Sequence, residues 1–124
     1  MKRLFGMTAL AVVLATGSAY AQTTVKIGVL SDMSSLYADI GGPGSVAAAK
    51  LAVADFNATN KDIKVEIVSG DHQNKPDVGS SIANQWLDVE KVDVIVDVPN
   101  SGVALSLNEI IRGKNKVFIN SGAA

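Results

Sequence analysis

Cysteine is absent from this chain of 124 residues, and His72 is its only histidine. Without cysteine there is no disulfide framework and no thiolate ligand for a metal, and one histidine cannot form a histidine cluster. The 11 basic and 12 acidic residues are nearly balanced, unlike the basic surface of a protein that binds nucleic acid. We therefore expect no metal, no cofactor and no nucleic-acid partner.

Apolar runs long enough to span a bilayer, which takes about 20 residues, are also missing. Residues 4–15 form an uncharged, largely apolar stretch of twelve that follows Lys2 and Arg3 and precedes the small-x-small tripeptide at residues 19–21. This three-part pattern is typical of a secretory signal peptide. We predict a signal peptide over residues 1–21 with cleavage after Ala21 and no stable membrane insertion. The expected location is beyond the inner membrane of a bacterium, periplasmic or outside the cell.

The rest of the chain alternates between strand and helix patterns. Short β-rich runs bounded by turn residues predict strands at residues 25–30, 63–68, 92–98 and 117–119. Between them, apolar residues at three- and four-residue spacing predict helices that begin at Ser45, near Pro76 and at Ser101. This order predicts an α/β fold, an open parallel sheet of at least four strands with three helices on both faces.

Single residues refine this interpretation. Residues 63–68 alternate apolar and charged side chains, which predicts a strand at the sheet edge. Trp86 falls on an apolar helical stripe, where packing is expected. The helix caps are predicted to be Asn74 or Asp77, then Ser101, with Gly113 in the left-handed conformation at the end of the third helix.

In such a sheet the ligand crevice lies outside the carboxyl ends of the strands. Asn100, Ser101 and Gly102 come between the third strand and its helix, where backbone amides at the positive end of the helix dipole favour a carboxylate. Plain helix capping is the other role open to Ser101. The residues that follow the fourth strand are expected beside that loop, where they add a hydroxyl and a close backbone approach: Ser121, Gly122 and Ala123.

Two kinds of chemistry match the sequence poorly. The glycines of residues 41–44 precede a helix, but they stand about ten residues beyond the first strand and no G-K-[ST] motif occurs, so a flexible approach to the helix is favoured over a phosphate loop. A hydrolase would need a G-x-S-x-G elbow, which is absent, and His72 as its base. We predict instead that His72 is solvated in a polar turn, and that the protein binds without catalysing.

Taken in order, these segments resemble the periplasmic solute-binding proteins of the leucine/isoleucine/valine type that serve ABC importers. The residues that carry the resemblance are 25–30 (VKIGVL) with Ser34 and Gly41 beyond them, 52–57 (AVADFN), 92–96 (VDVIV) before Ser101, and 117–123 (VFINSGA). The resemblance covers all of residues 22–124. It implies the N-terminal part of the first of two α/β lobes, which close together over a small organic solute.

The resemblance also implies which residues bind. In the family the first lobe grips a carboxylate through the loops after strands three and four, and the first loop adds a side chain at the mouth of the cleft. By position the ligand-binding residues are Tyr37, Asn100, Ser101, Gly102, Ser121, Gly122, Ala123 and Ala124. The implied partners are a small-molecule solute, an amino acid or a related carboxylate or amide, and the permease subunits of an ABC importer. Solvent exposure is the other interpretation of Tyr37.

The chain departs from the family in two ways. Ser35 and Asp97 stand where the family often has glycine, and an acidic group near the crevice disfavours a simple amino-acid carboxylate. Family members are also much longer, and their second lobe is absent from this sequence. We therefore predict that the chain alone binds weakly or not at all. A lobe of a ligand sensor and a truncated gene product without function remain alternatives.

Overall fold

A computed structural model of the protein describes residues 22–123; the predicted signal peptide (residues 1–21) and the candidate residue Ala124 lie outside the described residues. Strands and helices alternate along the chain: β1 (Thr23–Ser31), α1 (Gly42–Thr59), β2 (Ile63–Asp71), α2 (Pro76–Asp88), β3 (Val94–Asp97), α3 (Ser101–Arg112) and β4 (Val117–Asn120). The strands form one parallel sheet in the order β2-β1-β3-β4. The predicted fold class is confirmed, and β2 lies at the edge as expected.

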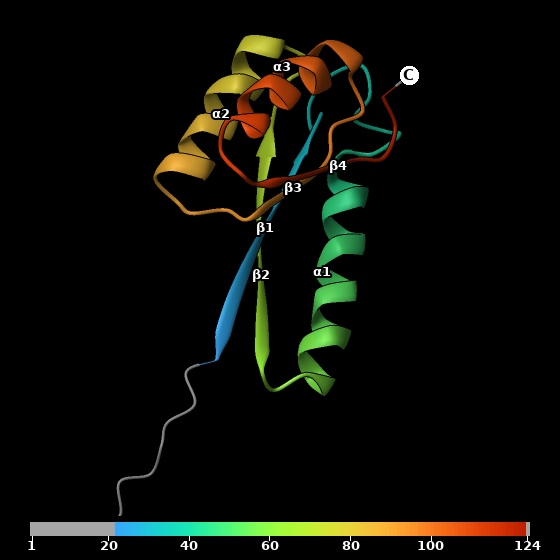
Figure 1. Ribbon diagram of the computed structural model, residues 1–124. Helices are drawn as coiled ribbons and strands as arrows, with labels where there is room; N and C mark the ends of the chain where they lie inside the picture. Colours follow the sequence, from blue (N-terminus) through green and yellow to red (C-terminus); the bar gives the residue numbers. More distant parts are fainter. Residues whose placement is uncertain (1–21, 124) are drawn as a thin grey trace, which may run out of the picture.

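The helices lie on both faces of this sheet, with α1 on one side and α2 and α3 on the other (Figure 1). β1 and β2 have nine residues each, and β3 and β4 have four. The first two strands therefore extend beyond the layer formed by α2 and α3 (Figure 1). Parallel strands place all their carboxyl ends, and the loops that follow, at one edge of the sheet.

The hydrophobic core lies between the sheet and the α2–α3 layer. Its buried side chains are Leu30, Ala83, Trp86, Leu87, Val92, Ile95, Val98, Val103, Leu107 and Ile111. Trp86 packs in this core, as its position on the apolar stripe predicts. A Cβ added to Gly28 of β1 would lie 2.5 Å from the indole, so the strand carries glycine where the ring meets the sheet.

The opposite face of the sheet is covered less completely. Gly42 is the only fully buried residue of α1, whose apolar side chains follow no strong helical periodicity. Val53 and Phe56 have the three-residue spacing that predicts one buried stripe, but Val53 is only half-buried and Phe56 is exposed. Asn57 lies there instead and exchanges hydrogen bonds of 2.8 and 2.9 Å with the carbonyl and amide of Val65 in β2.

Several predicted boundaries differ from the structure. α1 begins at Gly42, not Ser45, because Pro43 fits the first turn of a helix, where its missing N–H is not needed. β3 is Val94–Asp97, because the amide of Val92 bonds to the carbonyl of Trp86 and turns the chain before the strand. Gly113 is right-handed, with φ −74°, and not left-handed.

The predicted caps and the predicted exposure of the histidine also need correction. Lys75 precedes α2 and its side chain makes no capping hydrogen bond, so neither Asn74 nor Asp77 is the N-cap. Asn100, not Ser101, is the N-cap of α3. His72 is fully buried rather than solvated, because it packs against α2, where a Cβ added to Gly79 would lie 3.5 Å from His72 Cβ.

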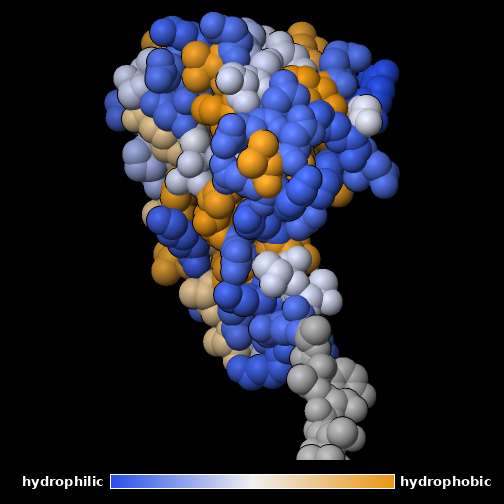
Figure 2. Space-filling view, turned by 90° about the vertical axis from the view of Figure 1, so that its left-hand side faces the viewer, coloured by the Kyte–Doolittle hydropathy of each residue, from blue (hydrophilic) through white to orange (hydrophobic). Residues whose placement is uncertain are grey.

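The outer surface of the helical layer is polar. On the side of the molecule where α2 lies, hydrophilic side chains predominate and apolar ones are scattered among them (Figure 2). Within residues 22–123, no helix combines the length and the apolar character needed to cross a membrane.

Candidate functional site

The loop from β1 to α1 is organised by a buried carboxylate. Asp32 has no exposed surface. Its Oδ1 accepts hydrogen bonds from the amides of Ser34 (3.3 Å) and Ser35 (2.8 Å), and its Oδ2 accepts from the Ser35 hydroxyl (2.6 Å) and the Tyr37 amide (2.9 Å). Four donors converge on one side chain, so the loop is folded around Asp32.

A second carboxylate holds the same loop from β2. Asp71 Oδ1 accepts from the Met33 amide (2.9 Å) and the Gln73 amide (2.8 Å), and its Oδ2 accepts from the Ser34 hydroxyl (2.6 Å). Burial raises the pKa of Asp32 and of Asp71, but the hydrogen bonds outweigh burial and the net pKa of each carboxyl is lowered. Both side chains are therefore held in the ionised form that these donors require.

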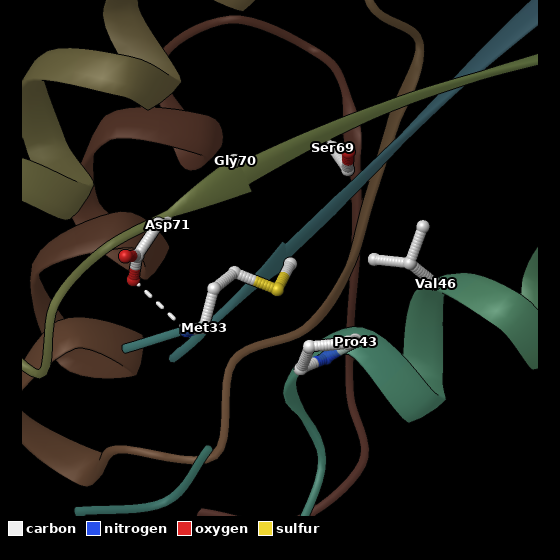
Figure 3. Close-up of a pocket in the computed structure, with 6 residues that line it drawn as sticks. All are labelled: Met33, Pro43, Val46, Ser69, Gly70 and Asp71. Carbon is white, nitrogen blue, oxygen red and sulfur yellow. Dashed lines mark hydrogen bonds between the residues drawn. The ribbon is translucent and has the colours of Figure 1, made fainter. Parts of the chain in front are cut away.

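Asp71 also lines a cavity of about 390 Å³ between the first turn of α1 and the end of β2. Figure 3 shows the Met33 side chain extended between the two elements, with Pro43 and Val46 across from it and the amide of Met33 bonded to Asp71. The walls are mostly apolar, and Asp71 is the only charged side chain among them.

At the start of α3 the polar groups are arranged by Asn100. Its Oδ1 accepts from the amide of Val103 (2.8 Å), and its Nδ2 donates to Oδ1 of Asn74 in the loop after β2. Ser101 is the first residue of the helix. The backbone amides of this first turn point along the helix axis at the positive end of its dipole.

The loop after β4 lies beside this helix start, as predicted. The amide of Ser121 donates to the carbonyl of Asp97 (3.2 Å) and its hydroxyl donates to Oδ1 of Asp97 (2.6 Å). The Gly122 and Ala123 amides donate to Asn120 Oδ1, at 3.1 and 2.8 Å. A Cβ added to Gly122 would make ordinary contact with the loop after β3, at 4.0 Å from Pro99 Cα.

One cavity of about 510 Å³ brings members of both loops together. It is lined by Ser101, Ala104, Leu105, Asn108, Phe118, Asn120 and Ala123. Of the predicted residues, Ser101 and Ala123 line it, and Asn100, Gly102 and Gly122 are their chain neighbours. Ser121 lines a different cavity, together with Asp97 and Ser45. Tyr37 lies apart from them, half-buried on the β1–α1 loop, and does not line this cavity.

Asp97 occupies a strained position at the end of β3. Asp97 and Val98 have φ values of 81° and 61°, which non-glycine residues rarely adopt. The turn directs the carboxylate toward Ser121 and the start of α1, where Asp97 Oδ2 is buried and has no hydrogen-bond partner among residues 22–123. A Cβ on Gly41 would lie 3.4 Å from Asp97 Oδ2 and 3.2 Å from Ser31 Oγ.

Sequence reasoning missed Asp32, Asp71 and Asn74 as organising residues. The Ser-Asp pair directly after the first strand was a usable signal, because aspartate side chains commonly bond to the backbone two residues on. The bond from Asn100 to Asn74 had no such signal, since 26 residues separate the two.

Comparison with known proteins identifies the family. A family model described as periplasmic binding protein matches residues 24–124. The chain belongs to the periplasmic binding protein family. No curated protein matches it. This match confirms the resemblance inferred from the sequence.

Two solved structures of bacterial binding proteins are similar to this periplasmic binding protein in sequence and fold. A periplasmic binding protein from Burkholderia mallei is 47% identical with a TM-score of 0.76, and the match covers 82% of this chain and 27% of that one. A branched-chain amino acid ABC transporter ligand-binding protein from Burkholderia xenovorans is 46% identical with a TM-score of 0.72, covering 81% of this chain and 27% of that one. The chain thus spans about a quarter of these relatives.

A more distant structure shares the fold. A solute-binding protein from Rhodopseudomonas palustris, in complex with 3,4-dihydroxybenzoic acid, is 24% identical with a TM-score of 0.74 and covers 82% of this chain and 28% of its own. The match shows that the four-stranded sheet with its three helices is the architecture of a periplasmic binding protein lobe.

Proposed function

We propose that the chain forms the N-terminal part of the first lobe of an ABC-importer substrate-binding protein. It captures a small organic solute with a carboxylate or related amide group, such as an amino acid, in the periplasm and delivers it to a membrane permease. In this proposal the protein is not an enzyme. One observation carries this proposal. The loop between β3 and α3 and the segment after β4 meet at the start of α3, where Ser101 and Ala123 line one cavity.

The electrostatics at the start of α3 favour the binding of a carboxylate. First-turn amides and the helix dipole favour an anion, and Asn100 fixes the backbone that presents them. Two structural neighbours contain isoleucine and 3,4-dihydroxybenzoic acid, both of which carry a carboxylate. The proposed ligand-binding residues are therefore Asn100, Ser101, Gly102, Ser121, Gly122, Ala123 and Ala124, with Tyr37 at the mouth of the cleft.

The chain alone is expected to bind weakly. If this lobe supplies half of the roughly −8 kcal/mol of a micromolar complex, about −4 kcal/mol remains, which corresponds to a millimolar Kd. Amide chemical shifts detect binding in this range. We expect titration with isoleucine or 4-hydroxybenzoate to shift the amides of Gly102 and Ser121, and the neutral amide of each compound to shift them less.

Two serines of α3 provide a matched pair for this titration. Ser101→Ala should reduce the shifts, because it removes the hydroxyl and keeps the backbone amides. Ser106→Ala should preserve them, because the Ser106 hydroxyl bonds to the Gly102 carbonyl of its own helix. Shifts of equal size with acids and neutral amides, or a loss with both serine variants, would contradict the proposal. Export is tested separately: the N-terminus of the protein from an osmotic-shock extract should be Gln22.

A further inference from the structure

His72 is a fully buried imidazole in the loop between β2 and α2. Its Nδ1 accepts a hydrogen bond of 3.0 Å from the amide of Asn74. An imidazole nitrogen that accepts a hydrogen bond carries no proton, so the ring is neutral and its proton is on Nε2. Within residues 22–123, Nε2 has no partner.

Asn74 continues the chain of contacts toward α3. Its backbone has φ 57°, a left-handed conformation that asparagine tolerates better than most residues. The Asn74 side-chain oxygen accepts from Nδ2 of Asn100, and Oδ1 of Asn100 accepts from the Val103 amide at 2.8 Å. Three side chains therefore connect the end of β2 to the first turn of α3.

These contacts determine which way the Asn100 amide points. Its nitrogen is engaged by Asn74 and its oxygen by Val103, so a rotation that exchanged the two ends would set donor against donor. The first turn of α3 is the proposed carboxylate site. The geometry of this site thus depends on His72, which contacts Asn100 only through Asn74 and lies outside both loops of the site.

We propose that His72 is a positioning residue for the carboxylate site: by accepting from the Asn74 amide it fixes Asn74, and through Asn74 it fixes the orientation of Asn100 at the start of α3. This inference rests on the proposed function. A role in packing alone is the competing explanation. Leucine would satisfy packing better, because a buried unpaired N–H such as that of Nε2 is unfavourable.

Asparagine and leucine at position 72 separate the two explanations, because the side chains are similar in size. In the full chain, His72→Asn keeps an acceptor near Nδ1 and His72→Leu removes it. We expect amide hydrogen exchange of Asn74 and Val103 to accelerate about fivefold in His72→Leu, the size of one ordinary hydrogen bond, and to change little in His72→Asn. The buried Leu107 amide serves as the reference for global unfolding.

Asn74→Gly breaks the same connection while leaving His72 in place, and glycine adopts the left-handed backbone without strain. The Val103 amide should exchange faster here too. In the double variant His72→Leu/Asn74→Gly, the Val103 amide should exchange no faster than in either single variant, because both changes break the same connection. Additive effects, or faster exchange with His72→Asn than with His72→Leu, would overturn the inference.

The solute affinity is measured with isoleucine and 4-hydroxybenzoate as probes. We expect the affinity to fall about fivefold in His72→Leu and to be retained in His72→Asn. If the wild type binds a probe and His72→Leu binds it equally with unchanged Val103 exchange, the positioning role is wrong and the proposed function stands. If His72→Leu speeds exchange of the Val103 amide and His72→Asn does not, but no variant binds either probe, the positioning of Asn100 stands and the assignment of these two carboxylates as ligands fails.

Discussion

Asp32 organises the β1–α1 loop as an ionised acceptor of four hydrogen bonds. Asp32→Asn replaces one carboxylate oxygen by an NH₂ group that faces other donors. We expect the free energy of unfolding to fall by about 1–3 kcal/mol, the cost of unsatisfied buried groups, and the Ser35 and Tyr37 amides to exchange faster. Urea denaturation and hydrogen exchange measure both effects. Asp39→Asn, an exposed change in the same loop, should leave both unchanged.

The burial of His72 predicts a pH dependence of stability. Burial lowers the pKa of this imidazole, although Asp32, Asp71 and Asp97 oppose the shift. Below its ordinary pKa of about 6.5 the unfolded chain binds a proton that the folded chain does not. The free energy of unfolding therefore falls as pH drops below that value toward the folded pKa, by up to about 1.4 kcal/mol per pH unit.

His72→Leu isolates this effect because the chain has one histidine. Urea denaturation at intervals between pH 5 and 7.5 should show a slope in the wild type that is smaller in the variant. The N-terminal amino group and the carboxylates with lowered pKa contribute equally to both proteins. Parallel stability curves would show that the imidazole is not buried in the neutral form.

The N-cap of α3 and the burial of His72 were both predicted wrongly from the sequence. Ser101 and Asn100 are adjacent and both are good N-cap residues, so only the backbone angles decide that Asn100 is the cap. His72 follows Asp71 and precedes Gln73, a polar context typical of an exposed turn. Its burial depends on α2 and α3 folding over the loop, which local sequence does not encode.

At the scale of the elements, the contact between β1 and α2 depends on Gly28. A Cβ there would lie 2.5 Å from Cε3 and Cζ3 of Trp86, so Gly28→Ala should lower the free energy of unfolding by about 1–3 kcal/mol through overpacking. Gly44 lies in α1, and a Cβ there meets nothing within 4 Å. Gly44→Ala should raise stability by about 0.5–1 kcal/mol. Thermal or urea denaturation of both variants tests this, and equal effects would contradict it.

The number, type and order of the elements could be predicted, because strand runs such as residues 92–98 are strongly apolar and the apolar stripes of α2 and α3 are regular. The ends of elements could not. β3 stops at Asp97, within the predicted run, because Asp97 and Val98 turn into positive φ. That turn is stabilised by hydrogen bonds from Asn120 and Ser121 at the end of β4, which is distant in sequence.

At the scale of the whole molecule, the α1 side of the sheet leaves apolar surface uncovered over β4. Val117 and Ile119 are 51% and 55% exposed, and β4 is an edge strand. Exposed apolar edge strands promote association, so Ile119→Lys should reduce self-association in sedimentation velocity at high concentration. Its free energy of unfolding should stay within about 0.5 kcal/mol of the wild type.

The matched control is Leu51→Lys, which adds the same charge at an exposed position of α1. It should leave self-association unchanged, because isolated surface apolar residues are ordinary. A similar reduction in both variants would attribute the effect to net charge rather than to the edge strand.

The sheet order has a consequence for the speed of folding. β1 comes first in the chain but lies between β2 and β3, and its pairs join Thr23 to Ile63 and Ile27 to Val94. Parallel pairings over such separations form slowly, because the chain loses entropy before the contacts compensate for it. β1 therefore remains unpaired until β2 and β3 have been synthesised. In the export proposed above, this delay keeps the chain unfolded while it crosses the membrane.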